Sequence, residues 1–291
     1  MEIKRLGNLK LALGECPVWH EHQLWLMDCR IGLIYALNPI TGALTARYEV
    51  PPPVGSFAFN NNGYIVLSLK EEIAAFNLNN GHLRTLARIE VNHPDVRLND
   101  GTSLQDGSFV VGTMHVLRQP DEAPLGGLYR LDTHLQLHKL ETGLGITNGP
   151  SVNPINQRFH VADTAAKTIY SYAMKSDGTL EDKQIFVQTD AYDSGPDGCC
   201  FDGEGGVWTA LVRVGALARF DMQGCLTHKI DLPLAHPSAV CFGGPEMADL
   251  FVTSISDSGR LSASGPLDGA VLKLTGLGFR GAARPLCHMP L

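Results

Sequence analysis

One unit repeats along this chain of 291 residues. Each unit has a polar residue near its start, which we call its marker. The markers show the repeat most clearly, because Asn148 follows Asn99 by 49 residues and Asp197 follows Asn148 by another 49. Each unit begins with a short stretch that contains the marker. Two apolar segments come next in the sequence, and a tight turn precedes each of them. Six markers occur in all: Glu15, Ser56, Asn99, Asn148, Asp197 and His236. A period of about 40–50 residues is typical of β-propeller blades.

The apolar runs have the length and composition of β-strands. In the first unit, 24–28 is followed by 32–38, and a weaker fourth run covers 44–50. Asn-Gly, Asp-Gly and Gln-Gly pairs favour tight hairpins, and no segment shows a sustained helical period. We therefore predict an all-β fold, a six-bladed β-propeller with four-stranded antiparallel blades, which spans residues 1–291 as a single domain. The segment 3–13 is expected to complete the last blade and so close the ring.

The charge balance and the cysteines limit the classes of partner and location. The formal net charge is −7 and no Lys/Arg-rich run occurs, so we expect no nucleic-acid partner. No uninterrupted apolar stretch reaches about 18 residues, and the N-terminal stretch lacks a signal-peptide apolar region, so we expect no membrane segment. The seven cysteines contain no Cys-x-x-Cys pair, which favours reduced thiols in a cytoplasmic protein. The oligomeric state stays open.

The six markers define a candidate site. In a propeller the innermost strands begin around the central channel, so residues at the equivalent position of different units are expected to face one another. Two carboxylates and two carboxamides in one small space suit a hard divalent cation such as Ca²⁺, Mg²⁺ or Mn²⁺, with Zn²⁺ or Fe²⁺ as alternatives. A lone Asn or Asp at a turn more often caps backbone groups. The recurrence of polar residues at one phase is what favours a shared site.

Several segments resemble the signature segments of the regucalcin/gluconolactonase family. They occur in the family's order across nearly the whole chain: GECPVW at 14–19, RLNDG at 97–101, VGTM at 111–114, TNG at 147–149 and PDG at 196–198. The resemblance implies a six-bladed propeller that acts as a metal-dependent sugar lactonase. It implies Glu15, Asn148 and Asp197 as metal ligands, with Asp197 also as the general base. It further implies Arg97 and Asn99 as the substrate-contacting pair.

These residue types suit the hydrolysis of a sugar lactone to its aldonic acid with one divalent metal ion as cofactor. The ion can polarise the ester carbonyl, and a carboxylate beside it can accept a proton from the attacking water. The forked guanidinium of Arg97 can hold ring or hydroxyl oxygens. An ion pair with Asp95 or Asp100 is the structural alternative for Arg97. Asp100 precedes a glycine and is expected to be a turn residue.

The segments that should border the pocket mouth depart from the family pattern and are basic. His115 and Arg118 follow the VGTM segment, and Arg213 follows the strand that contains Trp208. With Arg97 they predict a positive substrate-binding rim, unless an acidic residue at 121 or 122 pairs with Arg118. Such a rim favours a lactone that bears an acidic group, for example 6-deoxy-6-sulfogluconolactone. Two alternatives remain open: a related propeller esterase or phosphotriesterase, and a calcium-binding propeller without catalysis.

Overall fold

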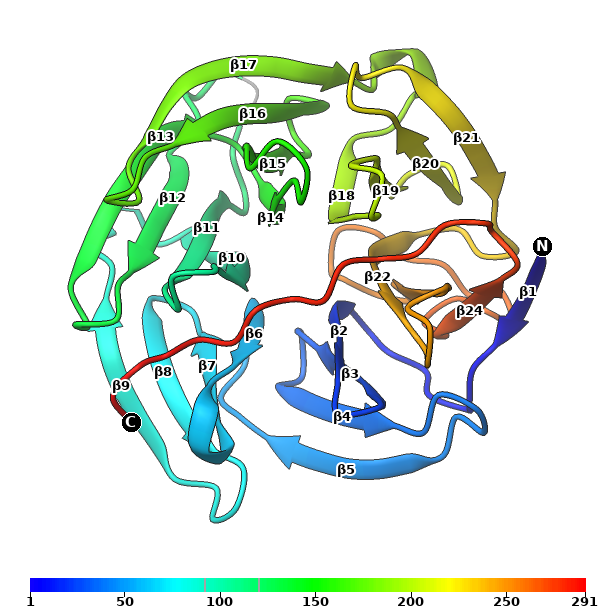
Figure 1. The fold of residues 1–291 in the computed structure, drawn as a ribbon, viewed down its shortest axis with the longest axis horizontal. Helices are drawn as coiled ribbons and strands as arrows, with labels where there is room; N and C mark the ends of the chain where they lie inside the picture. The colour runs from blue at the N-terminus through cyan, green and yellow to red at the C-terminus, as the bar shows by residue number, and fades with distance from the viewer. Residues whose placement is uncertain (92, 120) are drawn as a thin grey trace.

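The computed structural model describes residues 1–91, 93–119 and 121–291. Its strands form six four-stranded sheets arranged as blades around a central channel (Figure 1). This arrangement confirms the predicted six-bladed β-propeller. Two single-turn 3-10 helices, η1 (Asn61–Gly63) and η2 (Asp190–Tyr192), lie between strands. No helix in the described ranges is long and apolar enough to cross a membrane.

The first three blades each use four consecutive strands, ordered from the channel outward. Blade 1 contains β2 (Gly14–His20), β3 (Gln23–Asp28), β4 (Leu33–Leu37) and β5 (Leu44–Glu49). Blade 2 contains β6 (Ser56–Phe59), β7 (Tyr64–Ser68), β8 (Glu72–Asn77) and β9 (Leu83–Arg88). Blade 3 contains β10 (Val96–Ser103), β11 (Phe109–His115), β12 (Gly126–Leu131) and β13 (Leu137–Leu144).

Blades 4 and 5 follow the same plan, whereas blade 6 combines both ends of the chain. Blade 4 contains β14 (Thr147–Val152), β15 (Phe159–Asp163), β16 (Thr168–Met174) and β17 (Leu180–Gln188). Blade 5 contains β18 (Pro196–Phe201), β19 (Val207–Leu211), β20 (Ala216–Phe220) and β21 (Leu226–Asp231). Blade 6 contains β22 (Pro237–Gly243), β23 (Asp249–Ser254), β24 (Leu272–Thr275) and β1 (Glu2–Arg5).

The N-terminal strand closes the ring. β1 pairs antiparallel with β24, which places Glu2 opposite Thr275 and Arg5 opposite Leu272. The predicted closure by the segment 3–13 is therefore confirmed, although the strand ends at Arg5. Beyond it the chain turns inward, because Leu6 and Leu11 are buried in the core. Closure gives the last blade its fourth strand and protects its edge from unpaired contacts.

The core lies between the blades, where their apolar faces pack together. One cluster joins blades 1 and 2 through Trp25, Phe57 and Phe76, and another joins blades 5 and 6 through Trp208 and Phe242. Fully burying a large apolar side chain contributes roughly 1.5–3 kcal/mol. This packing on both faces of each blade holds the inner strands in fixed positions around the channel.

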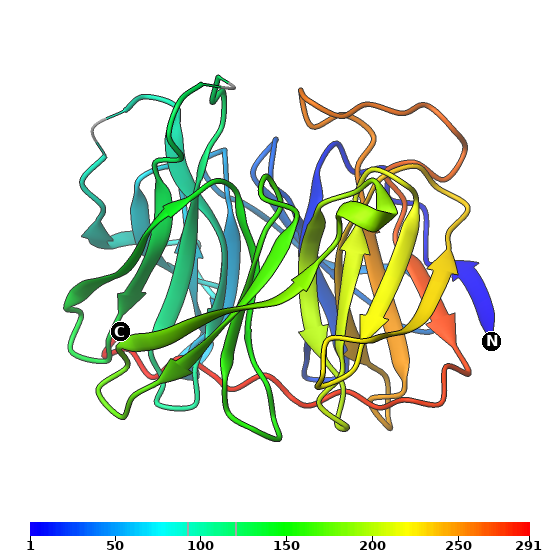
Figure 2. The same cartoon turned by 90° about the horizontal axis from the view of Figure 1, so that it is seen from above.

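The last residues of the chain, which we call the C-terminal strap (residues 276–291), cross one face of the ring over the channel (Figures 1 and 2). Backbone hydrogen bonds anchor the strap on opposite sides. The Gly203 N–H of blade 5 donates to the Arg280 carbonyl at 2.7 Å, and the Cys287 N–H donates to the Phe59 carbonyl of blade 2 at 2.7 Å. The strap therefore covers one end of the channel.

Candidate active site

A β-bulge interrupts the pairing of the inner strand in five of the six blades. The register shifts lie between Glu15 and Val18, Leu98 and Gly101, Asn148 and Ser151, Pro196 and Cys199, and Pro237 and Val240. Bulges re-aim side chains and are common beside active sites. The inner strand of blade 2 pairs without a shift, and its marker Ser56 is fully buried. The bulge thus accompanies every marker that reaches the channel.

The channel end opposite the strap holds a pocket that brings most of the predicted site residues together. Its lining includes Glu15, Arg97, Asn99, Asn148, Asp197 and Arg213. Asp197 is only 6% exposed, whereas Arg213 and Arg260 are exposed. The wall is otherwise largely apolar, with Met114, Ile146, Val212 and Leu261 among its members. The pocket therefore has acidic groups at depth and basic groups at its mouth.

A relay of hydrogen bonds runs through this pocket from blade 3 to blade 5. The Arg97 guanidinium donates to Asn99 Oδ1 at 3.0 Å, and the Asn99 amide donates to Asn148 Oδ1 at 2.8 Å. The Asn148 amide then donates to Thr164 Oγ1 at 2.8 Å, and that hydroxyl donates to the Pro196 carbonyl at 2.7 Å. The relay fixes the orientation of each side chain. Asn148 Oδ1 keeps a second lone pair for a ligand.

Glu15 and Asp197 are acids without a cationic partner: the ion pairs of the described residues include neither. Burial raises the pKa of Asp197 well above its ordinary value, and the negative charge of Asp100 raises it further. Burial also raises the pKa of Glu15, and Asp197 adds to the effect while Arg97 opposes it. A proton or a bound cation relieves this kind of repulsion between neighbouring carboxylates.

The donor set fits a hard divalent cation. The Glu15 and Asp197 carboxylates and the Asn148 carboxamide come from three blades, and no thiol or imidazole is among the described residues that line the pocket. Oxygen donors of this kind suit Ca²⁺, Mg²⁺ or Mn²⁺. The described part of the chain contains no cluster of three or more His, Cys, Asp and Glu side chains placed to hold a metal. The carboxamide and water would therefore have to complete the coordination, and this metal site stays a prediction.

Asp100 has a structural role in this region. Its Oδ1 accepts a hydrogen bond from the Gly101 N–H, and its Oδ2 accepts one from the Gly149 N–H, both at 2.8 Å. Because Gly149 starts the bulge of blade 4, the Asp100 carboxylate joins the inner strands of neighbouring blades. Both of its oxygens are thus used by backbone donors, but the residue lies at the bulge inside β10, so the prediction that it is a turn residue is wrong.

Arg97 is not held by a carboxylate. Within the described ranges it forms an ion pair with neither Asp95 nor Asp100, and its Nη1 donates to the Leu98 carbonyl at 2.8 Å as well as to Asn99. A guanidinium has five N–H donors, so several remain for a ligand. This geometry favours the substrate-contacting role over the structural ion pair.

His115 and Arg118 lie apart from this pocket. His115 is 2% exposed, and its ring packs edge-on against His93 with centroids 4.8 Å apart. Its neighbours Met114 and Val116 do line the pocket, so strand alternation directs His115 to the other side. Arg118 Nη1 donates to the Glu122 carbonyl at 2.9 Å. Neither residue is among the described pocket-lining residues.

Two of the six markers also lie elsewhere. The Ser56 hydroxyl lies 2.8 Å from the Ser68 hydroxyl and donates to the Asn99 carbonyl at 3.0 Å. His236 Nδ1 lies 2.8 Å from the Val212 carbonyl oxygen. Both therefore bind other parts of the protein, and neither is among the described residues that line the pocket.

Sequence reasoning missed Arg260, which reaches the pocket from the connection between β23 and β24 (residues 255–271). Figure 2 shows this loop on the face opposite the strap. A bridge between Asp257 and Ser262 makes its tip a small hairpin, and Arg30 Nη1 lies 2.5 Å from the Asp257 carboxylate. The length of this connection was the available signal, because the other connections between second and third strands are mostly short turns.

The comparisons with known proteins agree with this architecture. The family profile described as SMP-30/Gluconolactonase/LRE-like region matches residues 13–256. The chain belongs to this family. The resemblance inferred from the signature segments is thereby confirmed. The matched region includes all the signature segments and also Arg213, whereas Arg260 and the strap lie outside it.

Curated relatives of this SMP-30/gluconolactonase family member include two lactonases. A pentonolactonase of Haloferax volcanii is 31% identical over 283 residues, which cover 94% of both chains. A 6-deoxy-6-sulfogluconolactonase of Pseudomonas putida is 29% identical over 280 residues, again covering 94% of both chains. The solved structure of regucalcin, a calcium-binding protein from Agrobacterium tumefaciens, has a TM-score of 0.88 at 22% identity and covers 98% of this chain and 97% of that one. This last likeness shows a shared fold.

Proposed function

We propose that this chain hydrolyses a sugar lactone to the corresponding aldonic acid with the help of one bound divalent cation. The observation that carries the proposal is the pair of acids without cationic partners, Glu15 and Asp197, which share one pocket with Asn148, Arg97 and Asn99. The similarity to a pentonolactonase and a 6-deoxy-6-sulfogluconolactonase supports this reaction class.

The protein side chains have distinct tasks in this reaction. When bound, the cation would polarise the lactone carbonyl and stabilise the negative charge that develops on its oxygen. Arg97 and Asn99, oriented by the relay, hold sugar oxygens so that the ester carbon faces the attacking water. Asp197 accepts a proton from that water while the water oxygen bonds to the carbonyl carbon. The ring C–O bond then breaks, and Asp197 returns the proton to the leaving oxygen, which becomes a hydroxyl group. The new carboxylic acid releases the second proton of the water to solvent and becomes a carboxylate.

We further propose that the lactone carries an acidic group at the end away from the ester. Arg97, Arg213 and Arg260 line the pocket, and the ion pairs of the described residues include none of them. Seven other arginines each lie against a carboxylate: Arg30, Arg47, Arg88, Arg130, Arg158, Arg219 and Arg280. On a chain with a net charge of −7, unpaired guanidinium groups at one mouth favour a carboxylate, sulfonate or phosphate.

A panel of neutral and acidic sugar lactones, assayed with a pH indicator with and without EDTA, tests both parts. Turnover should be lost on chelation and restored by one of the divalent cations. Arg213→Gln and Arg260→Gln should each lower kcat/KM for the acidic lactone by about tenfold or more, because a charge-assisted hydrogen bond is lost, and leave the neutral lactone within about twofold. Arg47→Gln, which alters an exposed ion pair away from the pocket, is the matched control.

Each contrary outcome has a defined meaning. If the wild type prefers the neutral lactone and the arginine variants do not change this preference, the substrate has no acidic group and the protein is a neutral aldonolactonase. Turnover of aryl esters or phosphotriesters without lactone turnover favours a propeller esterase. Cation binding without any turnover favours a calcium-binding propeller.

The cysteines support a proposed cytoplasmic location. All seven are free, and six of them are buried, with Cys225 exposed. Free thiols persist in the reducing environment of the cytoplasm, whereas exported proteins commonly form disulfides. Thiol titration of the native and unfolded protein with Ellman's reagent would check the free state.

A further inference from the structure

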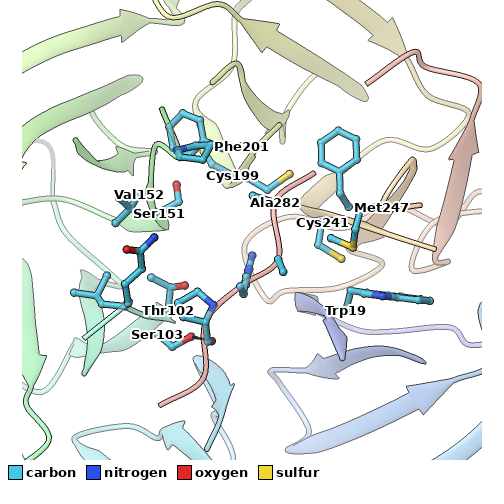
Figure 3. Close-up of a pocket in the computed structure, with 18 of the residues that line it drawn as sticks. Trp19, Thr102, Ser103, Ser151, Val152, Cys199, Phe201, Cys241, Met247 and Ala282 are labelled. Atoms are coloured by element: carbon cyan, nitrogen blue, oxygen red, sulfur yellow. Dashed lines mark hydrogen bonds between the residues drawn. The ribbon is translucent and has the colours of Figure 1, made fainter. Parts of the chain in front are cut away.

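A second cavity lies at the strap end of the channel (Figure 3). We call it the strap cavity. The inner strands that begin at the candidate active site end here, since Trp19 of β2, Ser103 of β10 and Phe201 of β18 line it. The strap contributes Ala282 and Arg284. The described linings of the two pockets share no residue, so the channel has a separate pocket at each end.

Arg284 is the one charged side chain among the described residues that line the strap cavity. It also lines the adjoining cavity beside Phe57 and Phe59, whose described lining contains no Asp or Glu. The ion pairs and side-chain hydrogen bonds found in the described ranges do not include its guanidinium. The side chain is half-buried, and the described residues give its guanidinium no hydrogen-bond acceptor.

The groups around Arg284 do not neutralise it. Burial raises the pKa of Cys241 to about 12 and raises that of Cys200 well above its ordinary value, so both thiols are neutral near pH 7. The Asp100 carboxylate attracts the guanidinium charge, but the ion pairs and hydrogen bonds of the described residues do not join the two groups directly. A half-buried guanidinium without a partner loses part of its hydration, and an anion in the cavity would offset that cost.

The walls of the strap cavity indicate what kind of anion fits. Trp19, Phe201, Phe242 and Met247 provide apolar and aromatic surface from three blades. Figure 3 shows the side chains of Trp19, Phe201 and Met247 around the strap segment that carries Ala282. The lining also includes polar side chains such as Gln105, Ser151 and Gln157, so apolar surface, hydrogen-bonding groups and one charge lie together, as is typical of a small-molecule site. An inorganic oxyanion would leave this apolar wall in contact with water.

We propose that the strap cavity is a second ligand site, which binds a small organic carboxylate. The carboxylate lies on the Arg284 guanidinium, whose planar fork matches its two oxygens. The apolar body of the ligand packs against Trp19, Phe201 and Phe242. This site is independent of the proposed lactonase activity, because it uses neither the acids nor the arginines of the other pocket.

Calorimetric titration of the full-length protein with benzoate as probe tests the proposal. Benzoate should bind in the millimolar range or tighter. Benzyl alcohol, which keeps the ring but lacks the charge, and acetate, which lacks the ring, should each bind at least about tenfold more weakly. Arg284→Gln should weaken benzoate binding by about tenfold or more, since it removes the charge-assisted pair.

Matched variants locate the binding. Arg280→Gln changes an exposed arginine of the same strap, paired with Glu246 at 2.6 Å, and should leave benzoate affinity unchanged. Arg97→Gln, in the other pocket, should also leave it unchanged. Ala282→Phe, which fills the strap cavity and keeps the charge of Arg284, should abolish binding. It replaces Arg284→Gln as the test if circular dichroism shows that Arg284→Gln is unfolded.

The following results would overturn the proposal: no benzoate binding by the wild type, equal affinity in Arg284→Gln, or loss of binding in Arg97→Gln. Inorganic sulfate that binds as tightly as benzoate would overturn the assignment of an organic carboxylate. Because none of these readouts depends on turnover, they are distinguishable from a failure of the lactonase proposal.

Discussion

The side-chain amide nitrogen of Asn99 lies 2.8 Å from Asn148 Oδ1, and this hydrogen bond joins the inner strands of blades 3 and 4. The same amide donates to the Thr147 carbonyl at 2.9 Å, while Asn99 Oδ1 accepts from Arg97 at 3.0 Å. Both amide protons and one lone pair of Asn99 are thus used inside the protein. Asn99 therefore orients Arg97 and Asn148, and it can offer a substrate one remaining lone pair.

The proposed metal set predicts how cation content responds to substitution. Elemental analysis of the purified protein should find about one divalent ion per chain, because the oxygen donors of Glu15, Asn148 and Asp197 come together in one pocket. Glu15→Gln combined with Asn148→Ala should lose most of that ion, since it removes one charge and one donor. Glu90→Gln, an exposed acid, is the control. Unchanged metal content in the double variant would disprove the ligand assignment.

Loss of the Asp197 carboxylate should reduce turnover more than it reduces metal content. Asp197→Asn keeps an oxygen donor but cannot accept a proton, so kcat should fall by about 10²-fold or more while circular dichroism stays unchanged. Asp193→Asn is a matched control, because this exposed residue has a φ of 54°, which Asn tolerates. Near-normal kcat in Asp197→Asn with the ion still bound would leave Asp197 as a ligand alone.

The stability of the metal-free protein should carry a pH signature of Asp197. Burial raises the pKa of this carboxyl group well above its ordinary value, so the folded chain keeps a proton that the unfolded chain releases above about pH 4. The resulting stabilisation is fully present below about pH 4 and is lost as the pH rises through the elevated pKa of the folded state.

Melting temperatures of the wild type and Asp197→Asn in EDTA, measured from about pH 4 to pH 8, test this sign. The wild-type value minus the variant value should fall as the pH rises, because the variant has no proton to lose at this position. A difference that rises with pH would contradict the raised pKa. Adding the cation should reverse the trend, since metal ligands bind in their deprotonated form.

The buried ion pair of blade 5 should be important for stability. Asp202 is fully buried, lies 2.6 Å from Arg219 Nε and accepts a hydrogen bond from Trp208 Nε1 at 2.9 Å. Asp202→Asn should lower the free energy of unfolding in urea by about 3–5 kcal/mol, because the buried guanidinium then keeps only the exposed Glu204 carboxylate, at 3.3 Å, as a counter-charge. Glu246→Gln, which breaks the exposed pair with Arg280, should cost less than about 1 kcal/mol. Equal effects of the two changes would refute this ranking.

The blade count and the meeting of three markers followed from the sequence alone. Each blade buries its faces against its neighbours, so a structural period of this size requires a matching period in the chain. The 49-residue spacing of Asn99, Asn148 and Asp197 therefore predicted both the ring and the channel end at which these residues lie. The turn residues also predicted where the strands lie, because the conformation of a hairpin depends on residues that are adjacent in the sequence.

Arg97 and Arg213 were predicted from the sequence and do line the pocket, but the other basic residues at the two ends of the channel were decided by tertiary structure. Arg118 lies near the predicted mouth in sequence but donates to the backbone of Glu122, whereas Arg260 lines the mouth and Arg284 lines the opposite end. The loop and the strap that carry the latter two have no place in the repeat. Their paths depend on contacts between distant segments, such as the hydrogen bond from Arg30 to the Asp257 carbonyl across 227 residues. The sequence by itself determined the ring and the acids around its channel, while non-local contacts of aperiodic segments decided which positive charges face them.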